Sequence, residues 1–131
     1  VLTPHPKEFV SLLKLCEIAD TSVQELQNNR FLYVEKFCKK YPNVVLLLKG
    51  ANVIIAQNEK IYVNSFGSAV LSKGGSGDVL SGLIGSLLAQ GYKPLEAAIS
   101  ASLAHAMGAR NYKKNNYSLI PSDLVEEIRK L

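Results

Sequence analysis

Apolar residues recur along the chain with two different periods, which predicts helices alternating with short strands. The helical period is clearest after Asp78, where one apolar stripe continues to Gln90 and Gly91 supplies a helix-ending signal. Further helices are expected at about residues 6–15, 22–28, 29–40, 94–107 and 121–131. Pro6, Pro94 and Pro121 stand at the starts of three of them, where proline is well tolerated.

A continuous apolar run at residues 44–48 predicts a strand that is buried on both faces, as in a parallel sheet covered by helices. Residues 53–56 and 61–63 form two more apolar runs, and the connection at 57–60 predicts an antiparallel hairpin between them. Helices and strands of these lengths indicate an α/β fold with a mixed sheet.

The stretch 72–90 holds the most informative chemistry, because a glycine-rich turn opens a helix there. Such a turn offers unpaired backbone amides and the positive end of the helix dipole to a phosphate or a developing anion. The amides of Gly75, Ser76 and Gly77 are the candidate anion hole. For Asp78 the residues leave two interpretations equally open: a helix N-cap, or a carboxylate that acts as general base beside the anion.

The two histidines are read differently. His5 lies between Pro4 and Pro6, which restrict the backbone and would present the ring to a ligand, although loop rigidity alone also explains the prolines. His105 lies in an Ala-rich apolar helix and is expected to be a satisfied core histidine. Two histidines so far apart do not indicate an imidazole metal site, and no protein metal site is predicted.

Composition restricts the class of protein. The chain has 131 residues, of which 47% are hydrophobic and 20% charged, as in one globular domain. The net charge of +4 is spread out, so no nucleic-acid partner is expected. No apolar run approaches the roughly 20 residues of a membrane span, and the free thiols of Cys16 and Cys38 suit a cytoplasmic protein. Since the sequence opens at Val1 as if in a strand, we expect a piece of a longer polypeptide.

Familiar nucleotide and hydrolase motifs are missing: the glycine-rich turn matches neither the P-loop nor the G-x-G-x-x-G pattern, and neither G-x-S-x-G nor H-E-x-x-H occurs. The ordered set of segments LTPHPKE, LLKGANVIIA, SKGGSGDVLSGLIGSLLAQG, AAISASLAHAMGA and PSDLVEEI nevertheless spans nearly the whole chain. This set resembles the catalytic domain of the ADP- or ATP-dependent NAD(P)H-hydrate dehydratases, a branch of the ribokinase-like superfamily.

The resemblance implies a three-layer ribokinase-like α/β fold whose mixed sheet is mostly parallel and carries a β-hairpin. Because the family domain is roughly twice this length, residues 1–131 would be the C-terminal part of a single domain. The implied co-substrate is ADP or ATP with Mg²⁺, and the implied substrate is hydrated NADH or NADPH. A homo-oligomer is also expected.

The resemblance also assigns roles to residues. His5 and Asp78 would contact the hydrated dinucleotide, and Gly77 with its neighbours would bind phosphate. The adenosine and phosphates would contact a single turn made of Lys49, Gly50, Ala51, Asn52 and Val53. The sequence departs from the usual family pattern at Lys7, Val53, Ser68 and Lys73, and Val53 removes the hydroxyl that a Thr would offer the nucleotide.

The implied reaction is that of a lyase: the hydroxyl of the hydrated nicotinamide is phosphorylated, phosphate leaves, and the C=C bond is restored. Asp78 would accept the hydroxyl proton and the anion hole would receive the charge of the transferring group. One alternative is a small-molecule kinase of the same superfamily, for example a vitamin-precursor kinase. Another is a non-catalytic module that binds an adenine nucleotide.

Overall fold

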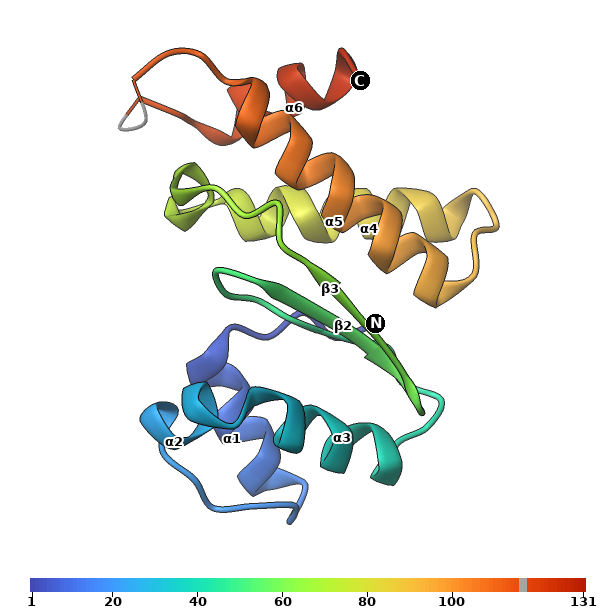
Figure 1. Cartoon of the computed structure of the whole chain (residues 1–131). Coiled ribbons are helices and arrows are strands. Elements are labelled where there is room, and N and C mark those ends of the chain that lie inside the picture. The colour runs from blue at the N-terminus through green and yellow to red at the C-terminus, as the bar shows by residue number, and fades with distance from the viewer. Residues whose placement is uncertain (116–117) are drawn as a thin grey trace. The chain divides into compact units, whose positions relative to one another are not determined.

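The computed structural model describes residues 1–115 and 118–131, which divide into two compact units, Val1–Val63 and Asn64–Leu131 (Figure 1). Each unit has a hydrophobic cluster of its own. The first unit contains three helices followed by three strands: α1 (Pro6–Leu15), α2 (Val23–Asn28), α3 (Arg30–Lys40), β1 (Leu46–Leu48), β2 (Val53–Gln57) and β3 (Lys60–Asn64), whose last residue begins the second unit.

The three strands form one sheet in the order β1-β2-β3, and pairing in it is mixed, as predicted. β1 and β2 run antiparallel, with Leu47 opposite Ile55. Leu2 and Leu46 form an isolated parallel bridge. Antiparallel residue pairs therefore outnumber parallel ones in this part of the sheet. The hairpin between β2 and β3 is confirmed with a tighter connection than predicted, since Asn58 adopts a left-handed φ of 52° that asparagine tolerates.

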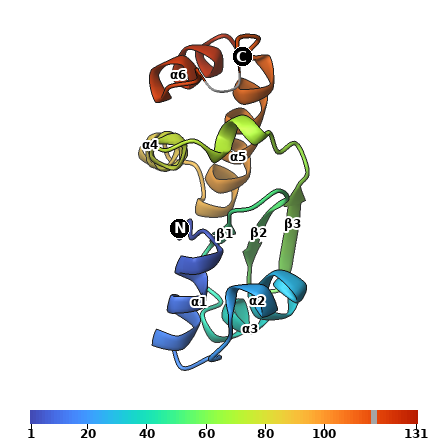
Figure 2. The ribbon, with the colours of Figure 1, turned by 90° about the vertical axis from the view of Figure 1, so that its left-hand side faces the viewer.

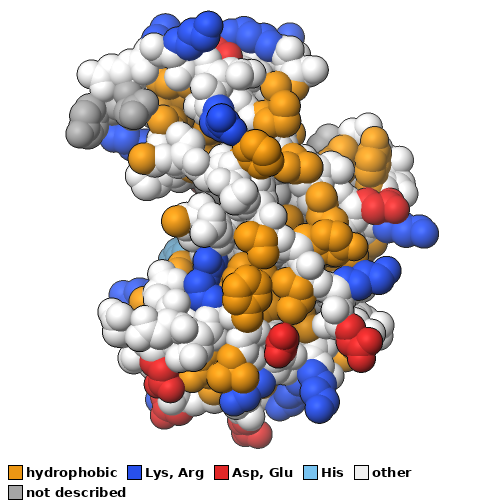
Figure 3. Space-filling model, in the orientation of Figure 1, with side chains coloured by type: hydrophobic (Ala, Val, Ile, Leu, Met, Phe, Trp, Pro, Cys, Tyr) orange, Lys and Arg blue, Asp and Glu red, His pale blue; other side chains and the backbone are white. Residues whose placement is uncertain are grey.

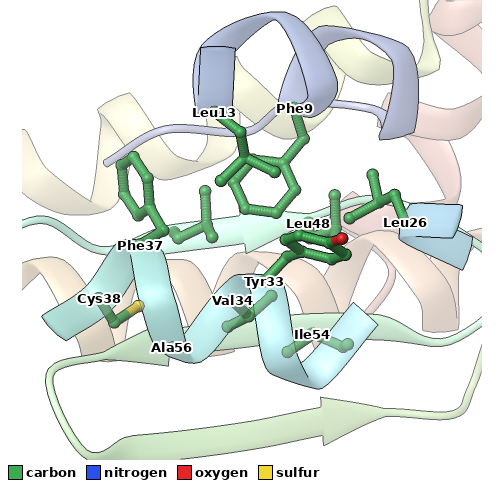
Figure 4. Close-up of a cluster of buried hydrophobic side chains, with 11 residues drawn as sticks. Phe9, Leu13, Leu26, Tyr33, Val34, Phe37, Cys38, Leu48, Ile54 and Ala56 are labelled. Carbon is green, nitrogen blue, oxygen red and sulfur yellow. The ribbon is translucent and has the colours of Figure 1, made fainter. Parts of the chain in front are cut away.

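Helices α1, α2 and α3 cover one face of this sheet (Figures 1 and 2). The register places Leu46 opposite Ala56 and Leu48 opposite Ile54, and all four residues belong to the hydrophobic cluster that the helices cover. Figure 4 draws this cluster. The predicted buried strand is confirmed, because residues 45–48 are all buried. The helices contribute the rest of the cluster: Phe9, Leu13, Leu26, Tyr33, Val34, Phe37 and Cys38.

The second unit is helical, with a short 3₁₀ turn, η1 (Ala69–Ser72), followed by α4 (Ser76–Ala89), α5 (Pro94–Asn111) and α6 (Pro121–Arg129). α5 packs against both α4 and α6. Its hydrophobic cluster contains Val70 from η1, Ala109 from α5 and Leu124 from α6, together with Tyr112 and Leu119. A buried hydrogen bond from the Asn64 side chain to the Ser102 hydroxyl, 2.9 Å, ties the start of this unit to α5.

The helix boundaries follow the sequence signals closely at most ends. Ser22 caps α2 by accepting from the Glu25 amide at 3.1 Å. α4 ends at Ala89, with Gln90 as its C-cap, two residues before the predicted end at Gly91, which has a left-handed φ of 90°. The beginning of α4 was predicted wrongly, because the helix starts at Ser76 rather than after Asp78. Its first turn carries small and polar residues, so the apolar stripe becomes visible only one turn later.

None of the helices in the described ranges combines the length and apolar character needed to cross a membrane. On the face drawn in Figure 3, acidic and basic side chains are interspersed over the unit of residues 1–63.

Candidate functional site

In the first unit, two of the predicted loops begin at the same edge of the sheet. The segment before α1 runs parallel to β1: the Leu47 amide donates to the Leu2 carbonyl at 2.8 Å, and the Lys49 amide donates to the Pro4 carbonyl at 2.9 Å. His5 and Gly50 each follow directly, so the prolyl loop and the 49–53 turn leave the sheet side by side. The family resemblance placed both loops at the nucleotide and substrate, and that assignment stays a prediction.

His5 is the N-cap of α1, a role that the sequence reading missed. Its ring Nδ1 accepts from the Glu8 amide at 3.2 Å, while the Glu8 carboxylate accepts from the His5 amide at 2.7 Å. This reciprocal pair is a capping box in which histidine replaces serine or threonine. The spacing of His5 and Glu8 was the signal that could have revealed it.

The capping box also has an electrostatic side. Glu8 Oε1 lies 3.3 Å from His5 Nε2, and both side chains are about half exposed. The hydrogen bond from the His5 amide lowers the pKa of Glu8, with a smaller contribution from the positive charge of Lys49. The His5 ring is thus held in one orientation at the edge of the sheet, still open to solvent.

The 49–53 turn is held by a residue that the sequence reading did not single out. Arg30, the first residue of α3, donates through Nη1 to the Asn52 carbonyl at 2.7 Å and through Nη2 to the Lys49 carbonyl at 3.2 Å. Gly50, Ala51 and Asn52 are exposed, so the outer surface of the turn is open to a ligand.

In the second unit, Gly75 is the N-cap of α4 and adopts a left-handed φ of 85°. The Ser76 amide donates to the Lys73 carbonyl at 3.3 Å, and the Asp78 amide donates to the Gly75 carbonyl at 3.1 Å. Within residues 1–115 and 118–131, neither the Gly75 nor the Gly77 amide has a hydrogen-bond acceptor. Two of the three amides proposed for the anion hole therefore remain available, and that of Ser76 is partly engaged in the turn.

Asp78 lies in the first turn of α4, with an exposed side chain. The N-cap interpretation is wrong, because Gly75 occupies the N-cap and no side chain caps the helix. An acidic residue in a first helical turn is still favoured by the dipole, which is the remaining purely structural explanation. The Asp78 carboxylate does not cap the helix, and it belongs to the same turn as the candidate amides.

Two buried contacts hold the first turn of α4 in place. The Ser76 hydroxyl donates to the Leu71 carbonyl at 2.6 Å, and His105 Nε2 lies 2.8 Å from the Ser76 carbonyl oxygen. A carbonyl only accepts, so Nε2 must carry the hydrogen. His105 is buried, which confirms the prediction of a satisfied core histidine and shows that it supports the glycine-rich turn.

No three His, Cys, Asp or Glu side chains gather into a metal-binding group anywhere in the described ranges.

The fold identifies the class of protein. The structure matches that of a ribokinase-like superfamily protein from Enterococcus faecalis with a TM-score of 0.78, over 98% of this chain and 42% of that one, at 22% identity. The chain therefore has the ribokinase-like α/β fold predicted from the sequence.

The family follows from closer matches. A profile of the NAD(P)H-hydrate dehydratase family matches residues 1–130, and the chain belongs to this family. It is 56% identical over 131 residues to the bifunctional NAD(P)H-hydrate repair enzyme Nnr of Helicobacter pylori, covering 100% of this chain and 28% of that protein. The ADP/ATP-dependent NAD(P)H-hydrate dehydratase of Bacillus subtilis, crystallised with ATP and Mg²⁺, matches with a TM-score of 0.85 at 29% identity, over 98% of this chain and 46% of that one. The chain thus spans less than half of either relative.

Proposed function

We propose that this chain is the C-terminal part of a single ribokinase-like domain, residues 1–131, that dehydrates hydrated NADH or NADPH at the expense of ADP or ATP. The observation that carries the proposal is the first turn of α4. There, the amides of Gly75 and Gly77 lack acceptors in the described ranges, and the exposed Asp78 carboxylate follows in the same turn. Amides at a helix start receive negative charge, and a carboxylate beside them can receive a proton.

The residues divide the work as follows. The turn formed by Lys49, Gly50, Ala51, Asn52 and Val53 contacts the adenosine and phosphates. The amides of Gly75, Ser76 and Gly77 bind the transferred phosphoryl group, whose charge they stabilise. His5 orients the hydrated dinucleotide with a ring whose position the α1 capping box defines.

The oxygen of the substrate hydroxyl attacks the terminal phosphorus of the nucleotide while Asp78 accepts the hydroxyl proton. The bond between that phosphorus and the leaving nucleotide breaks. The phosphate group then leaves with the electron pair of the C–O bond. Loss of a proton from the neighbouring ring carbon restores the C=C bond. The nucleotide brings Mg²⁺, which neutralises part of the phosphate charge.

The family and the solved structure of the Bacillus subtilis dehydratase, crystallised with ATP and Mg²⁺, support this choice of co-substrates. The location in the cytoplasm and the assembly into a homo-oligomer stay predictions from the sequence and the resemblance.

A product analysis tests the proposed reaction against its alternatives. Hydrated NADH or NADPH is supplied with ADP or ATP and Mg²⁺, and the reduced nicotinamide and free phosphate are measured. We expect both to appear in equal amounts and only when nucleotide is present. A stable phosphorylated product would identify a small-molecule kinase, and nucleotide binding without turnover would identify a non-catalytic module.

A further inference from the structure

The guanidinium of Arg30 donates hydrogen bonds to backbone carbonyls at both ends of the turn that joins β1 to β2. Besides the Asn52 and Lys49 carbonyls, Nη2 donates to the carbonyl of Leu48 at 3.3 Å, which is the last residue of β1. The acceptors lie 18 to 22 residues from Arg30 in the sequence. The three contacts therefore connect the beginning of α3 to the turn on both of its sides.

The position of Arg30 is unfavourable for the helix itself. It is the first residue of α3, where a positive charge opposes the helix dipole, and the first turn contains no acidic residue. No carboxylate pairs with Arg30 in residues 1–115 and 118–131, and burial lowers the pKa of its guanidinium. Since neither the helix nor a salt bridge explains a half-buried arginine here, the contacts with the turn are its main interaction.

These contacts also determine which way the turn presents its amides. In a planar trans peptide the C=O and N–H point in opposite directions, so a Lys49 carbonyl aimed at Arg30 turns the Gly50 amide away from it. The Gly50 amide has no acceptor in the described part of the chain. A Cβ on Gly50 would lie 2.9 Å from Nη2, so only glycine permits the guanidinium to approach this closely.

We propose that Arg30 is a positioning residue for the nucleotide: by binding the carbonyls of the 49–53 turn, it orients the Gly50 amide toward an adenine nucleotide's phosphates. The inference rests on the proposed function, since it takes the turn as part of the nucleotide site. A lysine would carry the same charge, but the planar arginine fork with two separate amino groups matches acceptors on both sides of a turn. Arg30 itself does not touch the reacting atoms.

The test compares Arg30→Met and Arg30→Lys with Lys39→Met, a control that removes one positive charge from the exposed C-terminal end of the same helix. We expect Arg30→Met to raise the Kd for ADP by about ten-fold or more, with Arg30→Lys intermediate and the control within about two-fold of the wild type. In steady-state kinetics the KM for the nucleotide should rise while kcat changes little, because nucleotide binding rather than chemistry is impaired.

Backbone NMR order parameters of Gly50, Ala51 and Asn52, measured without nucleotide, separate this inference from the proposed function. If the wild type bound no adenine nucleotide, the proposed function would be wrong, and so would the nucleotide part of this inference. Lower order parameters in Arg30→Met than in Lys39→Met would then still support the role of Arg30 in ordering the turn. Unchanged order parameters, or wild-type affinity in folded Arg30→Met protein, would overturn the inference. If Arg30→Met did not fold, Arg30→Lys would be judged by the same two measurements.

Discussion

His5 illustrates how one side chain can serve both the fold and a ligand. Its Nδ1 caps α1 at 3.2 Å from the Glu8 amide, while about half of the side chain remains exposed. The cap fixes the direction of the ring, and the exposed part of the side chain can still meet a substrate. The structural and functional explanations are therefore compatible, and a substitution that keeps only one of them separates their effects.

Replacing His5 by serine retains a good N-cap and removes the imidazole, whereas alanine removes both. We expect His5→Ala to lower the free energy of unfolding by about 1 kcal/mol and His5→Ser to leave it nearly unchanged. If the ring contacts the hydrated dinucleotide, His5→Ser should nevertheless reduce kcat/KM for that substrate. Urea denaturation and steady-state kinetics check the two effects, and wild-type kcat/KM in His5→Ser would restrict His5 to capping.

The roles of single residues could be predicted from the sequence only where the partners are close along the chain. The capping box of His5 and Glu8 is a spacing of three residues and was visible in principle. Arg30 contacts carbonyls 18 to 22 residues away, and Ser76 meets His105 after 29 residues. Such contacts depend on tertiary packing, which no local pattern encodes.

At the scale of elements, the start of α4 depends on a close approach between two segments. Gly75 has a φ of 85°, and a Cβ built on it would lie 2.5 Å from Cγ of Pro121 at the beginning of α6. Glycine is therefore favoured at this position for two reasons: it adopts a left-handed φ without strain, and it has no Cβ to clash with α6. This explains why the helix begins at Ser76, three residues before the apolar stripe that suggested its start.

Gly75→Ala should destabilise the second unit for two reasons. Alanine is strained at a left-handed φ, and its Cβ would be too close to Pro121. We expect a loss of about 2 kcal/mol or more in the free energy of unfolding. Gly74→Ala is the matched control, since a Cβ at Gly74 meets no atom within 4 Å and its φ is not in the left-handed range. Equal stability of the two variants in urea denaturation would contradict this account of the turn.

At the scale of the whole chain, the elements followed from hydrophobic periodicity, proline positions and glycine signals. α1 occupies the predicted residues, and the order of helices and strands is as expected. The balance of strand pairing did not follow, because an apolar run such as 44–48 reports burial on both faces and not the direction of its neighbour. The family-level assignment came from the ordered set of motifs, which carries more information than any one of them.

The central claim is that Asp78 acts as the general base beside the amides that open α4. Asp78→Asn keeps the size of the side chain and removes the base, and Asp20→Asn is a control at an exposed carboxylate of the first unit. A positioned general base is worth about 10² to 10⁴ in rate, so turnover should fall by that amount in Asp78→Asn alone.

The decisive measurement is kcat of Asp78→Asn for the hydrated dinucleotide, taken together with its Kd for ADP. We predict that kcat falls by about 10² to 10⁴ while the Kd for ADP stays within about two-fold of the wild type, because the substitution leaves the amides and the 49–53 turn unchanged. Wild-type kcat in this variant would contradict the account.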